Sequence, residues 1–127
     1  MRKVLMVEDD PVVAVVYQRF LDRHGFVVDI ARDGVEGLER LAAFQPDAIL
    51  LDLMMPKLSG ITVLSTVRAQ EIYRDLPIIV LTNACVPAFI DQATKAGANH
   101  IFDKSKVSPM AIVELLNRLF SATAKTV

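Results

Sequence analysis

This sequence of 127 residues has little cysteine, a net charge close to zero and no long apolar run. Cys85 is its single cysteine, which excludes an internal disulfide and gives no sign of an oxidising compartment. The formal net charge of −1 gives no general reason to expect binding to nucleic acid. No apolar segment is long enough to cross a membrane or to serve as a signal peptide. We therefore expect a soluble cytoplasmic protein with neither direct nucleic-acid binding nor membrane insertion.

The apolar content is high enough for one compact domain. Hydrophobic residues make up 53% of the chain, which is ample for a core at this size. The sequence contains no internal repeat, low-complexity tract or interdomain linker. We expect one domain over residues 1–122 and a short flexible tail over residues 123–127, with no output domain.

Apolar segments with strand character alternate with segments of helical periodicity along the whole chain. The predicted strands are residues 2–7, 26–31, 47–51, 77–81 and 99–102, and the predicted helices are residues 11–23, 34–43, 60–70, 86–96 and 108–121. In the first helix, apolar residues at helical spacing predict one buried face formed by Val12, Val13, Val16, Tyr17, Phe20 and Leu21. Such alternation favours a parallel sheet that helices cover on both faces.

The predicted strands differ in composition, and this difference suggests their order. The first, third and fourth are uniformly apolar, as expected of central strands that are buried on both faces. The second carries Asp29 in its middle and the fifth is short and mixed, which is typical of edge strands. The sequence therefore predicts an α/β fold of the flavodoxin-like, doubly wound kind. Its five-stranded parallel sheet has the order 2-1-3-4-5, with five helices on two faces.

Polar residues follow the predicted strands at the points where they end. Glu8 and Asp9 follow the first strand, Asp52 the third, Thr82 the fourth and Lys104 the fifth. In open α/β sheets, ligands bind at this carboxyl edge, near the point where strand order reverses. Carboxylate oxygens suit Mg²⁺, and a lysine and a hydroxyl beside the ion would complete a site for a phosphoryl group.

These residues match a known family in order and over nearly the whole chain. The chain resembles the receiver domain of two-component response regulators, of the single-domain type found in chemotaxis regulators. The motifs that carry the resemblance are Val7-Glu8-Asp9-Asp10-Pro11, Leu51-Asp52-Leu53-Met54-Met55-Pro56 with Gly60, Val80-Leu81-Thr82-Asn83, and Asp103-Lys104. Each motif is weak alone, whereas all four together are specific.

The resemblance implies a role for each matching residue. Asp52 corresponds to the phosphoacceptor, which takes a phosphoryl group from a histidine kinase or a histidine phosphotransfer protein. Asp9 corresponds to a direct Mg²⁺ ligand, and Glu8 reaches the ion through water. Met54 corresponds to the residue whose backbone carbonyl also binds the ion.

Two further residues correspond to those that respond to phosphorylation. Thr82 matches the hydroxyl that moves toward the phosphoryl group, and Lys104 matches the lysine that pairs with Asp52 and later with the phosphate. The resemblance thus implies a signalling module rather than an enzyme. It switches binding to a downstream protein target and catalyses only its own phosphorylation and dephosphorylation.

The chain departs from the family at three positions. Ile101 stands where an aromatic switch residue is usual, and Phe102 beside it points to the opposite face of the strand. We therefore expect signalling through the loops and the helix at 86–96, without an aromatic ring flip. Ser105 replaces a common proline, which predicts a trans Lys104-Ser105 bond. Asn83 replaces a small residue and is expected to alter phosphoryl lifetime or access by small donors.

Other functions remain open from the residues alone. The intact site acids argue against a receiver-like module that acts through phosphate-independent protein contacts, but Ile101 and Asn83 keep it as the alternative. A haloacid-dehalogenase-like phosphatase needs a second acid at the position of Met54, and a flavin-binding protein needs a loop without the acids at 8–10. A wide apolar stripe on the last helix, with Met110, Val113 and Phe120 beside its core face, indicates either deeper burial or a dimer contact through the last two helices.

Overall fold

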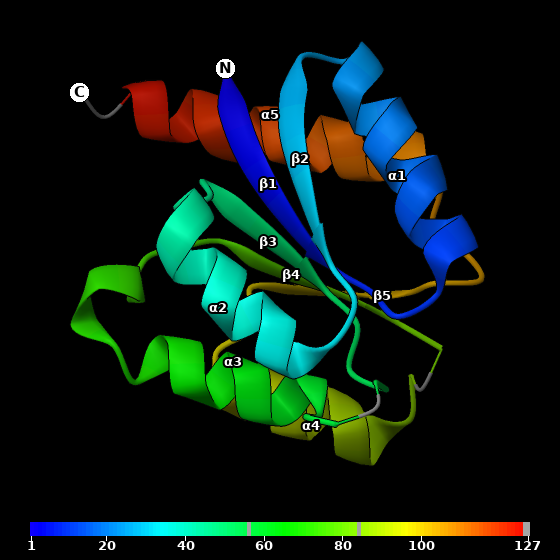
Figure 1. Ribbon diagram of the computed structural model, residues 1–127, viewed down its shortest axis with the longest axis vertical. Coiled ribbons are helices and arrows are strands. Elements are labelled where there is room, and N and C mark those ends of the chain that lie inside the picture. Colours follow the sequence, from blue (N-terminus) through cyan, green and yellow to red (C-terminus); the bar gives the residue numbers. More distant parts are fainter. Residues whose placement is uncertain (56, 84, 126–127) are drawn as a thin grey trace.

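The computed structural model describes residues 1–55, 57–83 and 85–125, with side chains described as far as residue 121. Pro56 of the second motif and the tail residues 126–127 lie outside the described part. Five strands form one parallel sheet in the order β2-β1-β3-β4-β5 (Figure 1). The strands are β1 (Arg2–Val7), β2 (Phe26–Ala31), β3 (Ala48–Leu51), β4 (Ile78–Thr82) and β5 (His100–Asp103). The predicted fold class and strand order are confirmed.

Five helices cover the two faces of the sheet. They are α1 (Pro11–Arg23), α2 (Gly34–Phe44), α3 (Gly60–Arg68), α4 (Pro87–Ala96) and α5 (Pro109–Lys125). Helices α1 and α5 lie against one face, whereas α2, α3 and α4 lie against the other (Figure 1). A short 3-10 helix, η1 (Glu71–Tyr73), follows α3 and was not predicted. The last helix continues to Lys125, beyond its predicted end at residue 121.

Side-chain caps and one proline explain where the first helix begins. The carboxylate of Asp10 accepts hydrogen bonds from the backbone N–H groups of Val12 and Val13, at 2.9 and 3.4 Å. Pro11 then occupies the first helical position, where the missing N–H is not needed. Ser108 starts α5 in the same way, because its Oγ accepts from the N–H of Ala111 at 3.2 Å.

The buried face of α1 differs from the predicted one. Ala14, Tyr17 and Leu21 are buried against the sheet, with Val13 and Phe20 packed beside them. Val12 is 70% exposed and Val16 is 50% exposed. The six apolar residues cover more of the helix circumference than the sheet does, so periodicity alone placed the buried stripe too far to one side.

The wide apolar stripe of α5 is explained by burial within the molecule. Val113 is fully buried, and Phe120 packs against the same core cluster as Ile112 and Leu116. The guanidinium of Arg2 also lies over the Phe120 ring, 4.9 Å from the ring centroid. Burial accounts for Val113 and Phe120, but Met110 is 40% exposed, so the dimer contact through α4 and α5 stays a prediction. Separately, no helix in the described part of the chain has the length and apolar character to cross a membrane.

Candidate functional site

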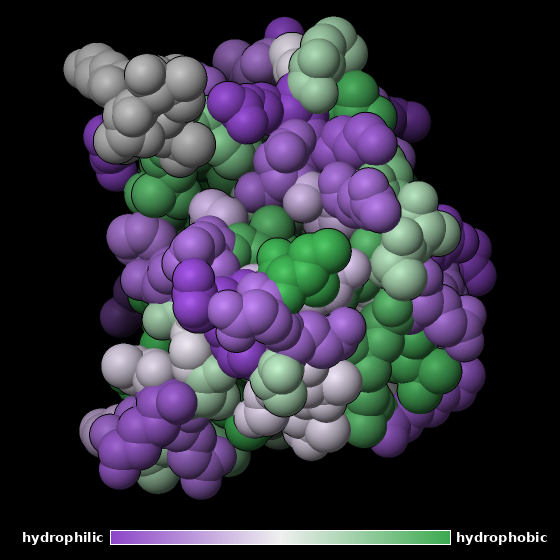
Figure 2. Space-filling model, turned by 90° about the vertical axis from the view of Figure 1, so that its left-hand side faces the viewer, coloured by the Kyte–Doolittle hydropathy of each residue, from purple (hydrophilic) through white to green (hydrophobic). Residues whose placement is uncertain are grey.

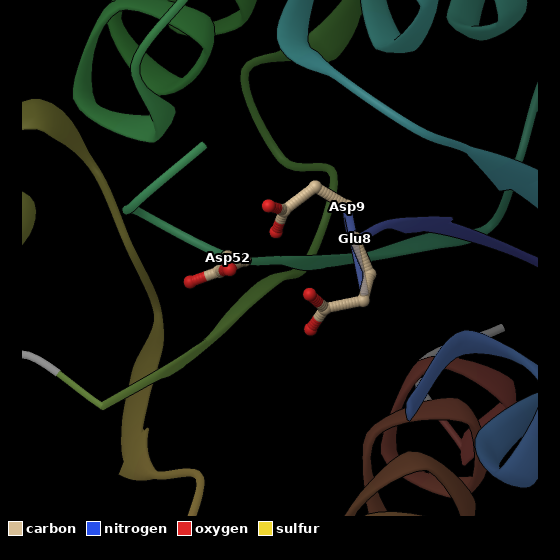
Figure 3. Close-up of side chains that lie close together, drawn as sticks. All are labelled: Glu8, Asp9 and Asp52. Atoms are coloured by element: carbon tan, nitrogen blue, oxygen red, sulfur yellow. The ribbon is translucent and has the colours of Figure 1, made fainter. Parts of the chain in front are cut away.

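Three carboxylates meet where β1 and β3 end (Figure 3). One oxygen from each of Glu8, Asp9 and Asp52 lies within 4.8 Å of the other two. We refer to these three residues as the acidic cluster. Glu8 and Asp52 are buried, whereas Asp9 is exposed. The cluster thus opens to solvent through Asp9 and extends inward through the other two carboxylates.

Pairing between neighbouring strands holds two of these residues in place. The N–H of Asp52 donates to the carbonyl of Val7 at 3.0 Å, and the N–H of Glu8 donates to the carbonyl of Ala31 at 2.9 Å. Both residues therefore continue the hydrogen-bonded ladders that β1 forms with β2 and β3. The buried sheet holds the backbones of Glu8 and Asp52 in place, and this fixes the spacing of their carboxylates.

The loop after β3 folds back over Asp52. The N–H of Met54 donates to Asp52 Oδ1 at 3.2 Å, and the N–H of Gly60 donates to the carbonyl of Leu53 at 2.9 Å. A Cβ atom on Gly60 would lie against the carbonyl oxygen of Asp52 and 2.5 Å from Leu53 Cα. This close approach explains why glycine occupies the first position of α3.

Lys104 places its ammonium among the buried carboxylates. Its Nζ lies 2.7 Å from Glu8 Oε1 and 3.2 Å from Asp52 Oδ2, and its side chain is 11% exposed. The contact with Glu8 is an ion pair without hydrogen-bond geometry, so Oε1 is a buried acceptor with no hydrogen bond among the described residues. The N–H of Asp10 donates to the other oxygen, Oε2, at 3.1 Å.

Burial raises the pKa of both Asp52 and Glu8. Desolvation is the larger cause for each, and the charge of a neighbouring acid adds to it. Lys104 opposes the shift in both cases. Burial lowers the pKa of Lys104 itself, but the two carboxylates outweigh burial and raise it overall. A single lysine therefore does not fully compensate the acidic cluster, which leaves it suited to a further cation.

Thr82 and Asn83 lie at the same edge of the sheet, at the end of β4. Thr82 is fully buried, and its carbonyl accepts from the N–H of Lys104 at 3.0 Å. Asn83 is exposed beside it. Strand β4 is the neighbour of β3, so Thr82 and Asp52 belong to adjacent strand ends.

The other two departures from the family pattern, Ile101 and Ser105, are accommodated without strain in the sheet and in the loop after β5. Ile101 packs in the core cluster beneath α2, α3 and α4, whereas Phe102 packs in the cluster on the opposite face, as predicted. The Lys104-Ser105 bond is trans, because the described part of the chain contains no cis peptide. Asp103 Oδ1 accepts from the N–H and the Oγ of Ser105, at 2.9 and 2.6 Å, which stabilises this turn without proline.

Two residues near the site were not assigned a part in it from the sequence. Asp10 of the first motif caps α1, and its N–H donates to Glu8. The Asp10-Pro11 pair is a recognisable helix start and could have revealed this function. Tyr17 is buried on α1, as predicted, and burial raises the pKa of its hydroxyl, with smaller effects from the charges of Lys104 and Glu8. The periodicity of the helix placed Tyr17 on the buried face, but its nearness to these charges depends on how α1 crosses the sheet.

The acidic cluster has the chemistry of a site for a hard divalent cation. Its oxygen donors match the preference of Mg²⁺. Lys104 adds a positive charge 3.2 Å from Asp52 Oδ2. The arrangement can hold a cation and a phosphoryl group side by side at Asp52.

Comparison with known proteins gives one consistent family. Residues 4–118 match the model of the response regulator receiver domain. Response regulator MprA of Mycobacterium ulcerans is 38% identical over 124 residues, which cover 98% of this chain and 51% of that protein. The chain thus spans about half the length of the curated relatives it matches.

Solved structures agree with this match. Chemotaxis protein CheY4 of Vibrio cholerae superposes with a TM-score of 0.86 at 30% identity, covering 93% of this chain and 98% of that one. The Mn²⁺-bound form of response regulator Rcp1 superposes with a TM-score of 0.77 at 25% identity, covering 84% of each chain.

Proposed function

The chain belongs to the response regulator receiver family of two-component signalling, and from this premise we propose that Asp52 accepts a phosphoryl group. The observation that carries the proposal is that Asp52 contacts Lys104, at 3.2 Å, and is also a member of the acidic cluster. The donor is a phosphohistidine of a histidine kinase or of a histidine phosphotransfer protein. The output is altered binding to a downstream protein target.

In the transfer, a carboxylate oxygen of Asp52 attacks the phosphorus atom of the donor. The new O–P bond forms as the P–N bond to the donor histidine breaks, and the imidazole leaves with the electron pair. Lys104 pairs with a phosphoryl oxygen, which offsets negative charge as the group arrives. Met54 N–H, which lies 3.2 Å from Asp52 Oδ1, helps to orient the attacking carboxylate.

Asp9, Asp52 and the backbone carbonyl of Met54 would hold Mg²⁺, with Glu8 acting through water. When bound, the ion supplies positive charge that neutralises carboxylate and phosphoryl oxygens. The Mn²⁺-bound form of Rcp1 supports a divalent cation in a related protein. Asp9 is the exposed acid of the cluster, so an ion would reach the site without displacing the buried side chains.

Phosphorylation would bias the loops around the site between two states. Thr82 would move toward the phosphoryl group, and the β4–α4 loop would follow. Ile101 provides no ring to rotate, so the change would pass through the loops and α4. The receiver function does not depend on whether a further domain accompanies it in the full protein.

The partner that carries the phosphohistidine must reach the open side of the acidic cluster. Val12, Val15 and Val16 form an exposed apolar strip at the start of α1, directly after the site loop. A helix of the partner could pack on this strip while its histidine points at Asp52. Exposed apolar residues beside a polar site are typical of such contacts.

Intact-mass spectrometry tests the phosphoacceptor role. We expect one Mg²⁺-dependent phosphoryl adduct after incubation with acetyl phosphate, and none on the Asp52→Asn variant. A partner kinase or beryllofluoride should be tried next if the small donor fails. An adduct that persists on Asp52→Asn would contradict the assignment of Asp52.

The second candidate is a module that binds partners without phosphorylation. Ile101 in place of an aromatic residue favours it, because the usual coupling of the hydroxyl to a ring is absent. Failure of both phosphorylation and beryllofluoride binding would support this alternative. Comparing phosphoryl lifetime in Asn83→Ala with the parent would show whether that departure alters dephosphorylation; equal lifetimes would exclude such an effect.

A further inference from the structure

Helix α4 is attached to the core at its end and not at its start. Ala93, Ala96 and, just beyond the helix, Ala98 belong to the core cluster beneath α2, α3 and α4, whereas residues 85–92 belong to neither core cluster. Val86, just before the helix, is 47% exposed. Burial therefore stabilises the second half of α4 and contributes little to the first half.

The two ends of α4 are also capped differently. Val86 occupies the N-cap position, and its apolar side chain cannot accept a hydrogen bond from the first turn. At the other end, Gly97 has φ +110°, and its N–H donates to the carbonyl of Thr94 at 3.1 Å. The N–H of Ala98 donates to the carbonyl of Ala93 at 3.0 Å, which completes a Schellman motif. The last turn of α4 is thus closed, whereas its first turn is not.

Arg68, the last residue of α3, holds the end of α4 from outside the helix. Its Nε donates to the carbonyl of Gly97 at 2.9 Å, and its Nη2 donates to Asn99 Oδ1 at 2.8 Å. Its Nη1 donates to the carbonyl of Tyr73 at 2.7 Å. Asn99 is bonded in turn to Ile78, whose N–H and carbonyl pair with its Oδ1 and its N–H at 2.8 and 2.9 Å. We call Arg68 and its three acceptor residues the Arg68 clamp.

Helix α3 gives the clamp a fixed base. Helices α3 and α4 lie side by side (Figure 1). Val63, Leu64 and Val67 of α3 are buried, and Gly60 at its start packs closely against the backbone of the loop after β3. The side chain that holds α4 therefore projects from an element with several buried residues, which opens less readily than α4 does.

The clamp is remote from the acidic cluster. Ile78 begins β4 and Thr82 ends it, so the length of this strand separates the clamp from the edge that carries the site. Figure 2 faces the end of the molecule where the strands begin, and hydrophilic and hydrophobic side chains are interspersed on it. The start of α4 lies at the other end, where a short loop joins it to Thr82. A substitution at Arg68 therefore changes the hold on α4 without touching a residue of the site.

We propose that α4 is a hinged helix, which opens from its start and turns about the Arg68 clamp. A change at Thr82 then moves the start of α4 and leaves its end in place. The hinge is a property of the fold and does not rest on phosphorylation of Asp52. Arg68 is a positioning residue, because it contacts the end of α4 and not the site.

Amide hydrogen exchange of the full ¹⁵N-labelled chain, without phosphodonor or divalent cation, tests the hinge residue by residue. Residues 90–92 and 95–98 both lie in hydrogen-bonded turns, but only the second group is clamped. In the parent, protection factors at residues 95–98 should exceed those at residues 90–92 by about tenfold or more. Arg68→Met keeps an apolar stem and removes every donor of the clamp. It should lower protection at residues 95–98 by about tenfold and leave residues 90–92 unchanged, because these already open without the clamp.

Two further variants control for charge and for failure to fold. Arg74→Met is the matched control, because this neighbouring arginine is 68% exposed and pairs with Glu71 at 2.9 Å on the surface. It should leave the protection of α4 unchanged. Arg68→Lys keeps the charge but offers one ammonium in place of the guanidinium, so its loss of protection at residues 95–98 should be smaller than that of Arg68→Met. This variant decides the proposal if Arg68→Met does not fold.

Beryllofluoride with Mg²⁺ distinguishes failure of the hinge from failure of the proposed function. Its binding is detected directly by ¹⁹F NMR. In the parent, the bound form should change amide chemical shifts most at residues 86–91 and least at residues 95–98, and in Arg68→Met the changes should extend to residues 95–98. A missing bound signal would count against the phosphoacceptor site, and the exchange data without ligand would still decide the hinge.

Three outcomes would overturn the proposal. Equal protection of residues 90–92 and 95–98 in the parent would mean that α4 opens as one unit. Equal loss of protection in both groups in Arg68→Met would mean that Arg68 supports the fold in general and not the end of α4. An equal effect of Arg74→Met would mean that loss of a positive charge, and not of the clamp, is responsible.

Discussion

The burial of Asp52 affects both its reactivity and the stability of the fold. It is 5% exposed, and its carboxylate shares Lys104 with Glu8. Burial raises its pKa, so the charged form is less favourable in the folded chain than in the unfolded one. The same arrangement that prepares Asp52 for a phosphoryl group therefore destabilises the fold near neutral pH.

Asp52→Asn should raise the free energy of unfolding at pH 7 by about 1 kcal/mol, because it removes the cost of burying a charged carboxylate and, to a smaller extent, its repulsion with Asp9, while Lys104 keeps Glu8. A raised folded-state pKa means that the stability cost of the charge is absent below the ordinary aspartate pKa of about 3.9. The cost grows as the pH rises and is complete above the raised value. The stability difference between the two proteins should therefore shrink on acidification.

Urea unfolding of both proteins in buffer without divalent cations, at several pH values, measures this difference. Asp91→Asn is the matched control, because Asp91 is an exposed acid on α4. A parent protein that is more stable than Asp52→Asn throughout would contradict the expected sign.

Mg²⁺ should stabilise the fold through the same residues. A ligand that binds only the folded state adds about 2.7 kcal/mol at a concentration one hundred times its dissociation constant. Asp9→Asn should lose most of this gain, since it removes the exposed donor of the acidic cluster. Thermal melts with and without MgCl₂ provide the readout, again with Asp91→Asn as the control. An equal response in Asp9→Asn would remove Asp9 from the ligand set.

Single residues could be predicted where their position follows from a strand end. Glu8, Asp9, Asp52, Thr82 and Lys104 all lie at the predicted edge, because parallel strands collect their carboxyl ends there. The pairing of Lys104 with Glu8 could not be predicted, since it joins residues 96 positions apart in sequence through side-chain geometry. The exposure of Val12 and Val16 was also missed, because it depends on which face of α1 packs against the sheet.

At the scale of elements, the β3–α3 loop is the most constrained by close packing. Gly60→Ala would force the loop away from Asp52 and Leu53, and overpacking of this kind costs roughly 1–3 kcal/mol. We expect lower stability together with weaker beryllofluoride binding, because Asp52 would be displaced. Calorimetry suits the measurement of both stability and beryllofluoride binding, because the chain has no tryptophan whose fluorescence could report them.

Gly25→Ala provides the comparison for this prediction. Gly25 has φ +89° but no atom within 4 Å of a new Cβ, so its cost is one of backbone conformation, about 1–2 kcal/mol. It should lower stability and leave beryllofluoride binding intact. Equal loss of binding in both variants would show that general destabilisation, and not the loop, was responsible.

Most elements could be predicted because each has a strong local signal. Capping residues mark the starts of α1, α3 and α5, and apolar runs mark the central strands. η1 was missed because its three residues carry no periodicity. Its conformation depends on Arg68, which binds the carbonyl of Tyr73 and so belongs to tertiary structure.

At the scale of the whole molecule, α4 is the helix with the weakest attachment to the core. Ala93 is its one buried residue among those described, and Val86 at its start offers no side-chain cap. The other helices of the same face bury several side chains each. Segments with little buried surface open most readily, so α4 is suited to respond to a change at the site.

Beryllofluoride with Mg²⁺ should therefore change amide hydrogen exchange most in α4 and in the β4–α4 loop. We expect Ile101 to keep its side-chain position, because it packs within the core cluster and has no ring to rotate. Hydrogen-exchange mass spectrometry and a structure of the bound form would check the two parts. Displacement of Ile101 comparable to an aromatic switch would contradict the expected mechanism.

The overall architecture followed from composition, since the strand with Asp29 and the short last strand lie at the edges of the sheet. The hollow of about 440 Å³ at the end of the sheet where the strands begin could not be predicted. It assembles from the ends of segments between Arg2 and Phe120, and none of these carries a motif. Surface recesses of this kind depend on how loops pack, which a periodic pattern does not encode.

The parallel arrangement of the strands gives the molecule two chemically different ends. β1 has six residues, so the ends are separated by roughly 20 Å at the usual rise per residue. A protein that contacts the acidic cluster would therefore cover one end of the sheet and leave the end where the strands begin open to solvent.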